Sequence, residues 1–194
     1  MNRGRPRQYD PDQALDAAMH LFWLQGYKAT TLHDLLKAMG LSKSSFYQGF
    51  GSKKALFLRC VNRYSDGISA LLLSSLDGAA SGRKFIKKLL LDSASEARRD
   101  QYRCGCMLMN TATEFAQKDP DIAARVTTGY ERLRLPLKSA ILRGQREGDI
   151  AGTDAEILAN YLISSLAGLR IVVKGGASEK MVKEIVDVMM KALI

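Results

Sequence analysis

The residues of this chain that are best suited to chemistry are two cysteines separated by one glycine, in the run Cys104-Gly105-Cys106-Met107-Leu108-Met109. A thiolate is both a nucleophile and a metal ligand, and the neighbouring Arg103 would favour that charged form. Three interpretations stay open. The thiols pack inertly in a core, they sense oxidants or electrophiles, or they bind a soft metal such as Cu(I) together with the methionine thioethers. The spacing is not that of a zinc site.

The local geometry limits how these thiols could act together. Cys104 and Cys106 would point apart on a helix, because residues i and i+2 do not share a helical face. An internal bridge therefore requires Gly105 to leave helical geometry. The third cysteine, Cys60, falls on an apolar stripe and is expected to be buried. Three cysteines, an odd number, do not indicate the disulfide framework of a secreted protein.

Nothing else in the sequence forms a catalytic group. The two histidines, His20 and His33, are isolated, and each is better explained by packing or solvent exposure. The chain has no G-x-S-x-G, H-E-x-x-H, phosphate-loop or dinucleotide-binding motif. The sequence therefore disfavours an enzyme and predicts neither a catalytic residue nor a bound cofactor.

The stretch from Thr30 to Phe50 shows a different kind of site. Thr31 and Asp34 form a T-x-x-D capping box at the start of one short helix. Gly40 stands where a helix end needs a left-handed residue, and Ser42 can cap a second helix. This second helix is polar where a buried helix would be apolar. The pattern predicts a helix-turn-helix whose second helix fits the major groove of DNA.

These residues carry a family resemblance that covers Asp10 to Leu58. The matching patterns are A-x-x-L-F-x-x-x-G-Y-x-x-T-T-L and M-G-L-S-K-S-S-F-Y-x-x-F-x-S-K-x-A-L. They resemble the DNA-binding domain of the TetR/AcrR transcriptional regulators. The resemblance implies that Tyr47 and Lys53 contact phosphates and that the start of the recognition helix reads bases. Gly49 departs from the family, which often has His or Tyr there, so one usual backbone contact is missing.

Charge supports a nucleic-acid partner. The net charge is +9, and residues 1–60 hold nine Lys/Arg against four Asp/Glu. The opening run Arg3-Gly4-Arg5-Pro6-Arg7 resembles the core of an AT-hook, which places arginines in a narrow minor groove. The alternative is a basic tail that adds only nonspecific attraction. The expected DNA contacts are Arg3, Arg5, Arg7, Thr31, Ser42, Lys43, Ser44, Ser45, Tyr47, Gln48 and Lys53.

Helical periodicity continues to the end of the chain. Asp10 and Pro11 begin the first helix, a linker lies at 77–82, and Thr153 is expected to cap the penultimate helix. The prediction is an all-α fold of about nine helices. Residues 1–51 form the N-terminal arm and the helix-turn-helix domain, and residues 52–194 form a helical ligand-sensing and dimerisation domain.

The last two helices carry more apolar surface than one subunit needs, and the family resemblance implies that they form a four-helix dimer interface. The alternative is that they only close the subunit core. The expected interface residues are Leu158, Leu162, Ser165, Leu169, Met181, Ile185 and Val188. A symmetric dimer also matches a palindromic operator.

The middle helices could enclose an apolar pocket for a small molecule. The residues expected to line it are Leu89, Cys106, Met109, Asn110, Thr113, Leu133 and Tyr161, with Cys104 as a second thiol.

The sequence thus predicts a homodimeric DNA-binding regulator, most simply a repressor released from a palindromic operator by a small-molecule or thiol-reactive inducer. The alternatives are a nonregulatory DNA architectural protein and an enzyme with a fused DNA-binding head. No apolar run long enough to span a bilayer and no apolar signal-peptide core are recognised, so we expect a cytoplasmic protein without a membrane partner.

Overall fold

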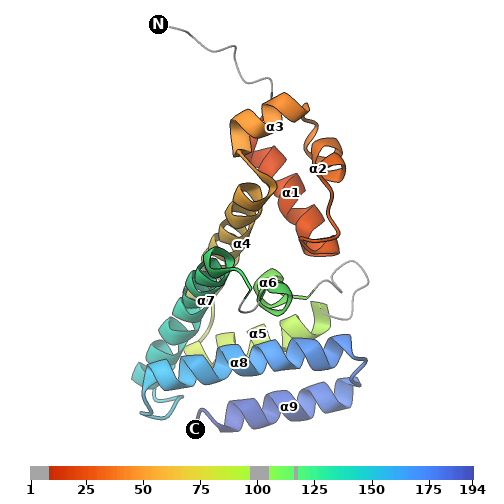
Figure 1. The fold of residues 1–194 in the computed structure, drawn as a ribbon. Coiled ribbons are helices and arrows are strands. Elements are labelled where there is room, and N and C mark those ends of the chain that lie inside the picture. The colour runs from red at the N-terminus through yellow and green to blue at the C-terminus, as the bar shows by residue number, and fades with distance from the viewer. Residues whose placement is uncertain (1–8, 97–104, 116–117) are drawn as a thin grey trace, which may run out of the picture.

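The computed structural model describes residues 9–96, 105–115 and 118–194, and the helices in these ranges pack into an all-α protein (Figure 1). Three short helices form a head at one end of the molecule. They are α1 (Pro11–Gln25), α2 (Leu32–Met39) and α3 (Lys43–Phe50). The other six helices form the body. They are α4 (Lys53–Asp77), α5 (Gly82–Glu96), α6 (Met107–Phe115), α7 (Pro120–Arg146), α8 (Ala155–Lys174) and α9 (Glu179–Lys191). The expected all-helical fold of about nine helices is therefore confirmed.

The helices of the head begin where the sequence provides a cap. The Asp10 carboxylate accepts the N–H of Asp12 at 2.8 Å, and Pro11 occupies the first helical turn. At the start of α2 the backbone N–H of Asp34 donates to the Thr31 hydroxyl at 3.1 Å, and the Asp34 carboxylate accepts the Thr31 N–H at 3.0 Å. Gly40 then ends α2 with φ = 63°. These local contacts fix the angle at which α3 leaves the turn.

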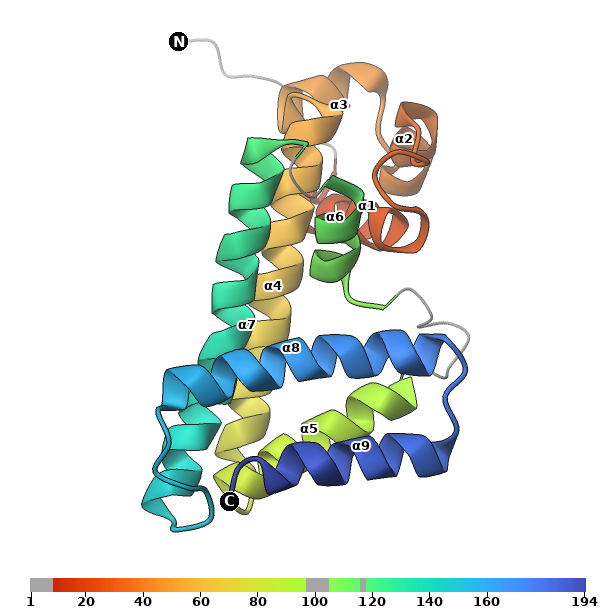
Figure 2. The ribbon, with the colours of Figure 1, turned by 60° about the horizontal axis from the view of Figure 1, so that its bottom comes forward.

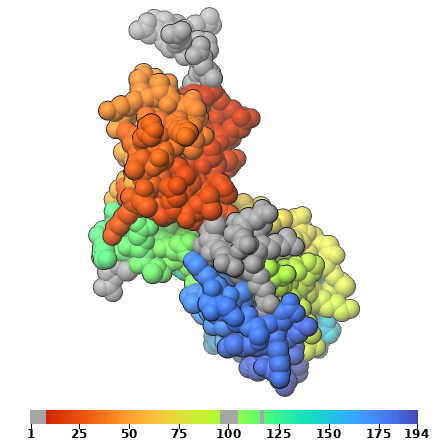
Figure 3. All heavy atoms as spheres, turned by 90° about the vertical axis from the view of Figure 1, so that its right-hand side faces the viewer, coloured from red at the N-terminus to blue at the C-terminus, as the bar shows by residue number. Residues whose placement is uncertain are grey.

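The long helices α4 and α7 run side by side and connect the head with the far end of the body (Figures 1 and 2). The space-filling view shows the head as a lobe above the body, with α8 and α9 at the opposite end (Figure 3). Asp119 and Pro120 begin α7 by the same cap-and-proline arrangement that begins α1. The cap of α8 differs from the expected one, because Asp154 rather than Thr153 accepts the first helical N–H groups.

Two hydrophobic clusters form the core. The first joins the head to the body, since Phe22 and Phe57 pack together with Met107, Leu108 and Phe115 of α6. The second cluster lies among α5, α7, α8 and α9. Burial of this much apolar surface is the main driving force for folding. The proposed boundary at residue 51 separates helices in sequence, but the first cluster continues across it.

One expectation about membranes needs correction. Among the described helices, the 20-residue α8 has a mean hydropathy of 1.4 and is long and apolar enough to pass a length-and-composition test for a membrane span. Leu158, Leu162 and Leu169 of this helix are buried in the protein core, and 28% of the tested window is buried. A core helix that is apolar on most sides passes the same test.

Candidate functional site

The outer face of α3 is polar and open to solvent. Phe46 and Phe50 point inward and are buried, so they anchor the helix to the head. Ser42 caps the helix by accepting the N–H of Ser45 at 3.1 Å. The remaining side chains of α3 therefore point outward, and the exposed ones include the predicted base-reading residues Lys43, Ser44 and Gln48.

The two predicted phosphate contacts have different surroundings. The Tyr47 side chain is 47% exposed beside the outer face of α3. The Lys53 ammonium lies 4.3 Å from the centroid of the Tyr27 ring, a cation–π geometry. Burial lowers the pKa of Lys53, while the nearby Glu114 carboxylate opposes that shift. Lys53 is therefore held against the body side of the head, and a phosphate contact would draw it away from that ring.

Tyr9, at the start of the head, explains why a glycine occupies position 49. A Cβ atom at Gly49 would lie 2.2 Å from the Tyr9 hydroxyl oxygen, so the missing side chain makes room for Tyr9. Tyr9 also contacts the Phe50 ring, with centroids 6.5 Å apart. The predicted minor-groove residues Arg3, Arg5 and Arg7 lie outside the described residues.

A cavity of about 570 Å³ lies in the body between the head and α8. This volume is within the range typical of small-molecule sites. Of the predicted lining residues, Leu89, Cys106, Met109 and Leu133 face the cavity. Asn110, Thr113 and Tyr161 are not among its lining residues, and Cys104 lies outside the described residues. Residues of the wall that were not predicted as such include Trp23, Tyr64, Tyr130 and Arg170.

One thiol, that of Cys106, lies in the cavity wall. Cys106 is 8% exposed and lines the wall directly before α6 begins. The Cys106 thiol lies near the Tyr64 hydroxyl, and its interaction with that group adds to the larger effect of burial in raising the pKa of Tyr64. Burial raises the pKa of Tyr64, so this phenol stays neutral at physiological pH. The other described cysteine, Cys60, lies in the first core cluster, where burial raises its thiol pKa.

Two contacts connect α6 directly to the head. The Trp23 indole N–H at the end of α1 donates to the Gly105 carbonyl oxygen at 2.9 Å. At the other end of α6, the Glu114 carboxylate accepts the backbone N–H of Tyr27 at 3.1 Å and that of Lys28 at 2.9 Å. We call this pair of amide contacts the Glu114 latch. The helix that carries the cavity wall is thus hydrogen-bonded at both ends to the corner between α1 and α2.

A further link lies between the starts of α4 and α7. The Lys54 ammonium is 2.9 Å from the Asp119 carboxylate and 2.8 Å from the Asp121 carboxylate. The hydrogen bond from Lys54 holds the pKa of Asp119 below its ordinary value. Both Lys54 and Lys53 therefore tie the first turn of α4, next to the head, to neighbouring elements.

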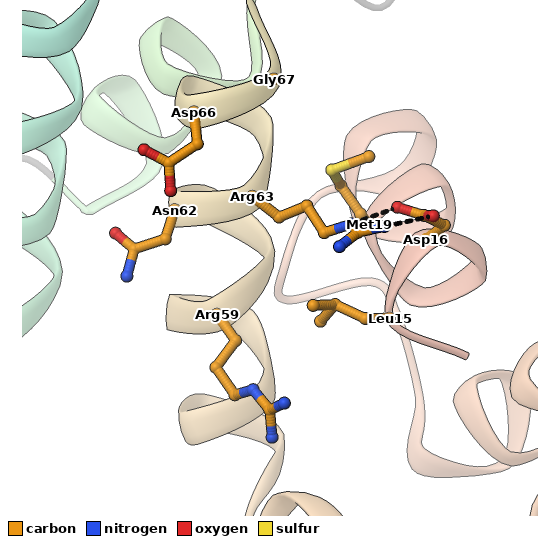
Figure 4. Close-up of a pocket in the computed structure, with 8 residues that line it drawn as sticks. All are labelled: Leu15, Asp16, Met19, Arg59, Asn62, Arg63, Asp66 and Gly67. Carbon is orange, nitrogen blue, oxygen red and sulfur yellow. Dashed lines mark hydrogen bonds and ion pairs between the residues drawn. The ribbon is translucent and has the colours of Figure 1, made fainter. Parts of the chain in front are cut away.

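A second hollow, of about 590 Å³, lies between α1 and α4 and is open to solvent (Figure 4). The Arg63 guanidinium crosses it and donates to both oxygens of Asp16, at 2.6 and 2.8 Å. This bidentate contact lowers the pKa of Asp16. Arg59 lies along the same side of α4, below Arg63 in the view of Figure 4. The ion pair between Arg63 and Asp16 thus links α4 to α1 across this hollow.

The predicted dimer residues fall into two groups. Leu158, Leu162 and Leu169 are buried inside the subunit, whereas Met181 and Val188 are exposed. Ser165 and Ile185 are half-buried. The predicted set therefore combined core positions of α8 with surface positions of α9. The large exposed apolar side chains of α8 are those of Ile157 and Ile171.

In the described parts of the chain, His, Cys, Asp and Glu side chains form no group of three or more that could hold a metal ion. The soft-metal interpretation needs Cys104, which lies outside these parts.

Comparisons with known proteins match both halves of the chain. A family model for bacterial regulatory proteins of the tetR family matches residues 14–60, and a model for the tetracyclin repressor-like C-terminal domain matches residues 84–189. The chain is 29% identical over 192 residues to the uncharacterised HTH-type transcriptional regulator YezE of Bacillus subtilis, covering 98% of this chain and 99% of YezE. It is 31% identical over 182 residues to the HTH-type transcriptional repressor ComR of Escherichia coli, covering 91% of this chain and 85% of ComR.

A solved structure shows a similar fold. It is that of a cysteine mutant of the TetR family transcriptional regulator CifR with a 26-base-pair double-strand operator DNA. The TM-score is 0.80 at 28% sequence identity, and the match covers 98% of this chain and all of that one.

Proposed function

We propose that this chain, which belongs to the tetR family of bacterial regulatory proteins, is a transcriptional repressor that an inducer releases from its operator. Its likeness to the repressor ComR and to the operator-bound CifR supports this proposal. The relatives are transcriptional regulators, and we extend that to a cytoplasmic protein without enzymatic activity. The outer face of α3 would read base edges in the major groove, and the N-terminal arginines would add minor-groove or phosphate contacts.

The repressor would act as a homodimer. Ile157 and Ile171 on α8 and Met181 and Val188 on α9 are large apolar residues exposed to solvent. Both helices lie at the end of the body opposite the head (Figure 1). Exposed apolar surface of this kind marks an interaction site. A two-fold axis through it would hold two heads at a fixed spacing, as a palindromic operator requires. Light scattering should give twice the mass of the chain, and Val188→Glu should reduce it to one chain.

The observation that carries the release mechanism is the position of α6. This helix forms part of the cavity wall and is hydrogen-bonded to the head through Gly105 and Glu114. A molecule that binds in the cavity and displaces α6 would therefore also move the corner between α1 and α2. Release from DNA follows if the inducer binds the displaced state more tightly than the DNA-bound state.

The inducer could be a noncovalent ligand or a thiol-reactive compound. In the second case the Cys106 sulfur would add to an electrophilic alkene. A carbon–sulfur bond forms, the carbon–carbon π bond breaks, and the thiol proton passes by way of solvent to the neighbouring carbon. The added group would enlarge a side chain that is buried in the wall, and close-packed interiors do not absorb such volume without movement.

The test uses the whole protein and an operator identified by a genome-wide footprint. Fluorescence anisotropy would follow DNA release as N-ethylmaleimide is added to wild type and to Cys106→Ser. We expect wild type to leave the DNA at micromolar reagent and Cys106→Ser to stay bound. If both are released at the same concentration, modification of Cys106 is not the cause of release.

The footprint also distinguishes a repressor from a nonregulatory architectural protein. A repressor should protect short operator-sized sites near promoters, whereas a nonregulatory architectural protein would protect long stretches with little sequence preference. An enzyme with a fused DNA-binding head is the least supported alternative, because no catalytic group was found in the sequence.

A further inference from the structure

Two polar groups from outside α3 lie against the last turn of that helix. The Tyr9 hydroxyl is so close to Gly49 that a Cβ atom at this position would overlap it. The Arg59 guanidinium, on α4, donates from Nη1 to the Gly49 carbonyl oxygen at 3.2 Å. Both side chains also contact the Phe50 ring, whose centroid is 6.5 Å from that of Tyr9 and 4.8 Å from the guanidinium carbon of Arg59. We call Tyr9 and Arg59 the flank pair.

The charge of Arg59 differs from that of its neighbour Arg63, which lies one turn further along the same side of α4 (Figure 4). Arg63 pairs with Asp16. The other carboxylate that lines this hollow, that of Asp66, pairs with Arg132. Arg59 is exposed and has no ion-pair partner in the described parts of the chain. A guanidinium has several N–H donors, and the carbonyl contact uses one of them, so the others can bind an anion.

The Tyr9 hydroxyl is not needed for packing. The ring supplies the contact with Phe50, which a phenylalanine at position 9 would also supply. No described residue forms a hydrogen bond with the hydroxyl, so its O–H stays available as a donor. Gly49 lies inside α3, where a glycine lowers helix stability relative to alanine. The chain thus has a glycine within this helix, next to a hydroxyl that the fold does not use.

Position 49 lies on the flank of α3 opposite Tyr47. Each residue of an α-helix turns the chain by about 100°, so positions 47 and 49 are about 200° apart. Phe46 and Phe50 point into the head. The two flanks therefore border the exposed face that carries Gln48. A helix in the major groove has one sugar–phosphate strand along each flank, so Tyr47 and the flank pair would face different strands.

We infer that Tyr9 and Arg59 bind the phosphate backbone of DNA along this flank, on the strand opposite to the one that Tyr47 contacts. The inference deepens the proposed function and rests on it for the DNA partner. The phenol O–H and the remaining guanidinium N–H groups donate to phosphate oxygens, and hydrogen bonds to an ionised acceptor are stronger than neutral ones. A backbone contact adds affinity for every sequence and fixes the position of α3 in the groove.

The test is anisotropy titration of the full chain with the operator and with a random-sequence duplex of equal length, at several salt concentrations. Tyr9→Phe removes one hydroxyl and no charge, so affinity should fall about threefold to tenfold on both duplexes without a change in salt dependence. Arg59→Gln removes a cation, so affinity should fall on both duplexes and the slope of log affinity against log salt concentration should fall by about one. Wild-type affinity in both variants would overturn the inference.

A purely structural role of Arg59 gives a different result. If the guanidinium only caps the last carbonyl groups of α3, Arg59→Gln should lower the thermal midpoint and the discrimination between bases while the salt slope stays unchanged. Arg59→Lys keeps the charge and should keep the wild-type slope. The control is Lys174→Gln, which removes one exposed positive charge at the end of α8, in the body. An equal change of slope in this control would assign the effect to net charge and overturn the contact.

Gly49→Ala tests the place of the Tyr9 hydroxyl without removing a polar group. The added Cβ would displace the hydroxyl oxygen, whereas its distance to the ring atom Cζ would be 3.5 Å, an ordinary contact. Gly49→Ala should therefore weaken DNA binding about as much as Tyr9→Phe, and the double variant should bind no more weakly than either single one. Additive losses would show that the hydroxyl does not act from this place.

The random-sequence duplex separates this inference from the proposed function. If wild type binds both duplexes equally, the repressor proposal fails, while losses in Tyr9→Phe and Arg59→Gln still support the backbone contact. If wild type prefers the operator and both variants bind as tightly as wild type, the proposed function stands and the inference fails.

Discussion

The Glu114 latch offers the sharpest test of how the cavity communicates with the head. Glu114→Ala removes the carboxylate that accepts the N–H groups of Tyr27 and Lys28 at 3.1 and 2.9 Å. The Trp23–Gly105 hydrogen bond and the aromatic contact of Tyr27 with Phe115 would remain. The change therefore weakens one of the two hydrogen-bonded links between α6 and the head, without removing an apolar side chain from the core.

The magnitude follows from the exposure of these groups. A hydrogen bond to a charged group contributes about 1.5–3 kcal/mol when it is well shielded. Both amides here are near the surface, so water can replace the carboxylate, and solvent screening reduces the contribution of each contact. We therefore expect the latch to contribute about 1 kcal/mol to coupling, within the usual range for allosteric proteins. Such a loss corresponds to about a fivefold change in an equilibrium constant.

The assay measures operator affinity by anisotropy with and without N-ethylmaleimide. The ratio of the two dissociation constants should fall about fivefold in Glu114→Ala, because less of the displacement of α6 reaches the head. The matched control is Thr113→Ala, in the adjacent residue of α6, where the exposed hydroxyl donates to the Met109 carbonyl of the same helix at 3.0 Å. An unchanged ratio in Glu114→Ala, or an equal fall in Thr113→Ala, would refute the latch as a route of communication.

Three further predictions test the fold and the proposed DNA contacts. A Cβ at Gly82 would lie 2.1 Å from the Ala140 carbonyl oxygen, whereas a Cβ at Gly78 would meet no atom within 4 Å. Thermal unfolding should therefore show Gly82→Ala destabilised by about 1–3 kcal/mol and Gly78→Ala close to wild type. Because burial raises the thiol pKa of Cys60, alkylation followed by mass spectrometry should find this cysteine modified more slowly than the cavity thiol; equal rates would contradict its buried place in the core. Gln48→Ala should reduce the discrimination between bases at one operator position by about 1–3 kcal/mol. Lys53→Ala should instead weaken binding to all DNA sequences alike and lower the slope of log affinity against log salt concentration by about one. A loss of affinity for Lys53→Ala that is confined to one operator variant would contradict a phosphate contact.

The parts of the fold that could be predicted from sequence depend on local chemistry. Capping by Asp10 and Thr31 and the left-handed Gly40 involve residues only a few positions apart, and the structure confirms each of them. The polar outer face of α3 was predictable for the same reason, since its periodicity is contained in eight residues. Its contact with DNA stays a prediction.

The cavity could be predicted only in part, because its walls depend on where each helix begins and how it is rotated. Cys106 lies directly before α6, which begins at Met107. Asn110 is exposed and Thr113 points away from the cavity, whereas Met109 faces it. A change of one residue rotates a helical position by about 100°. Of the residues of this helix that were expected to line a pocket, Met109 therefore faces the cavity, whereas Asn110 and Thr113 do not.

Long-range contacts were beyond a reading of local patterns, and they are the ones that give the cavity its character. The Trp23 indole N–H donates to the carbonyl oxygen of Gly105, which lies 82 residues later in the chain. Arg170 was not predicted to line the pocket, because a single cation in a largely apolar helix only interrupts the apolar pattern. Only the packing of α8 against α5 and α7 shows that this cation lies on the cavity face with Ile163 and Leu166. Which side chains of a helix face a cavity therefore depends on tertiary packing, and no local pattern in the sequence shows it.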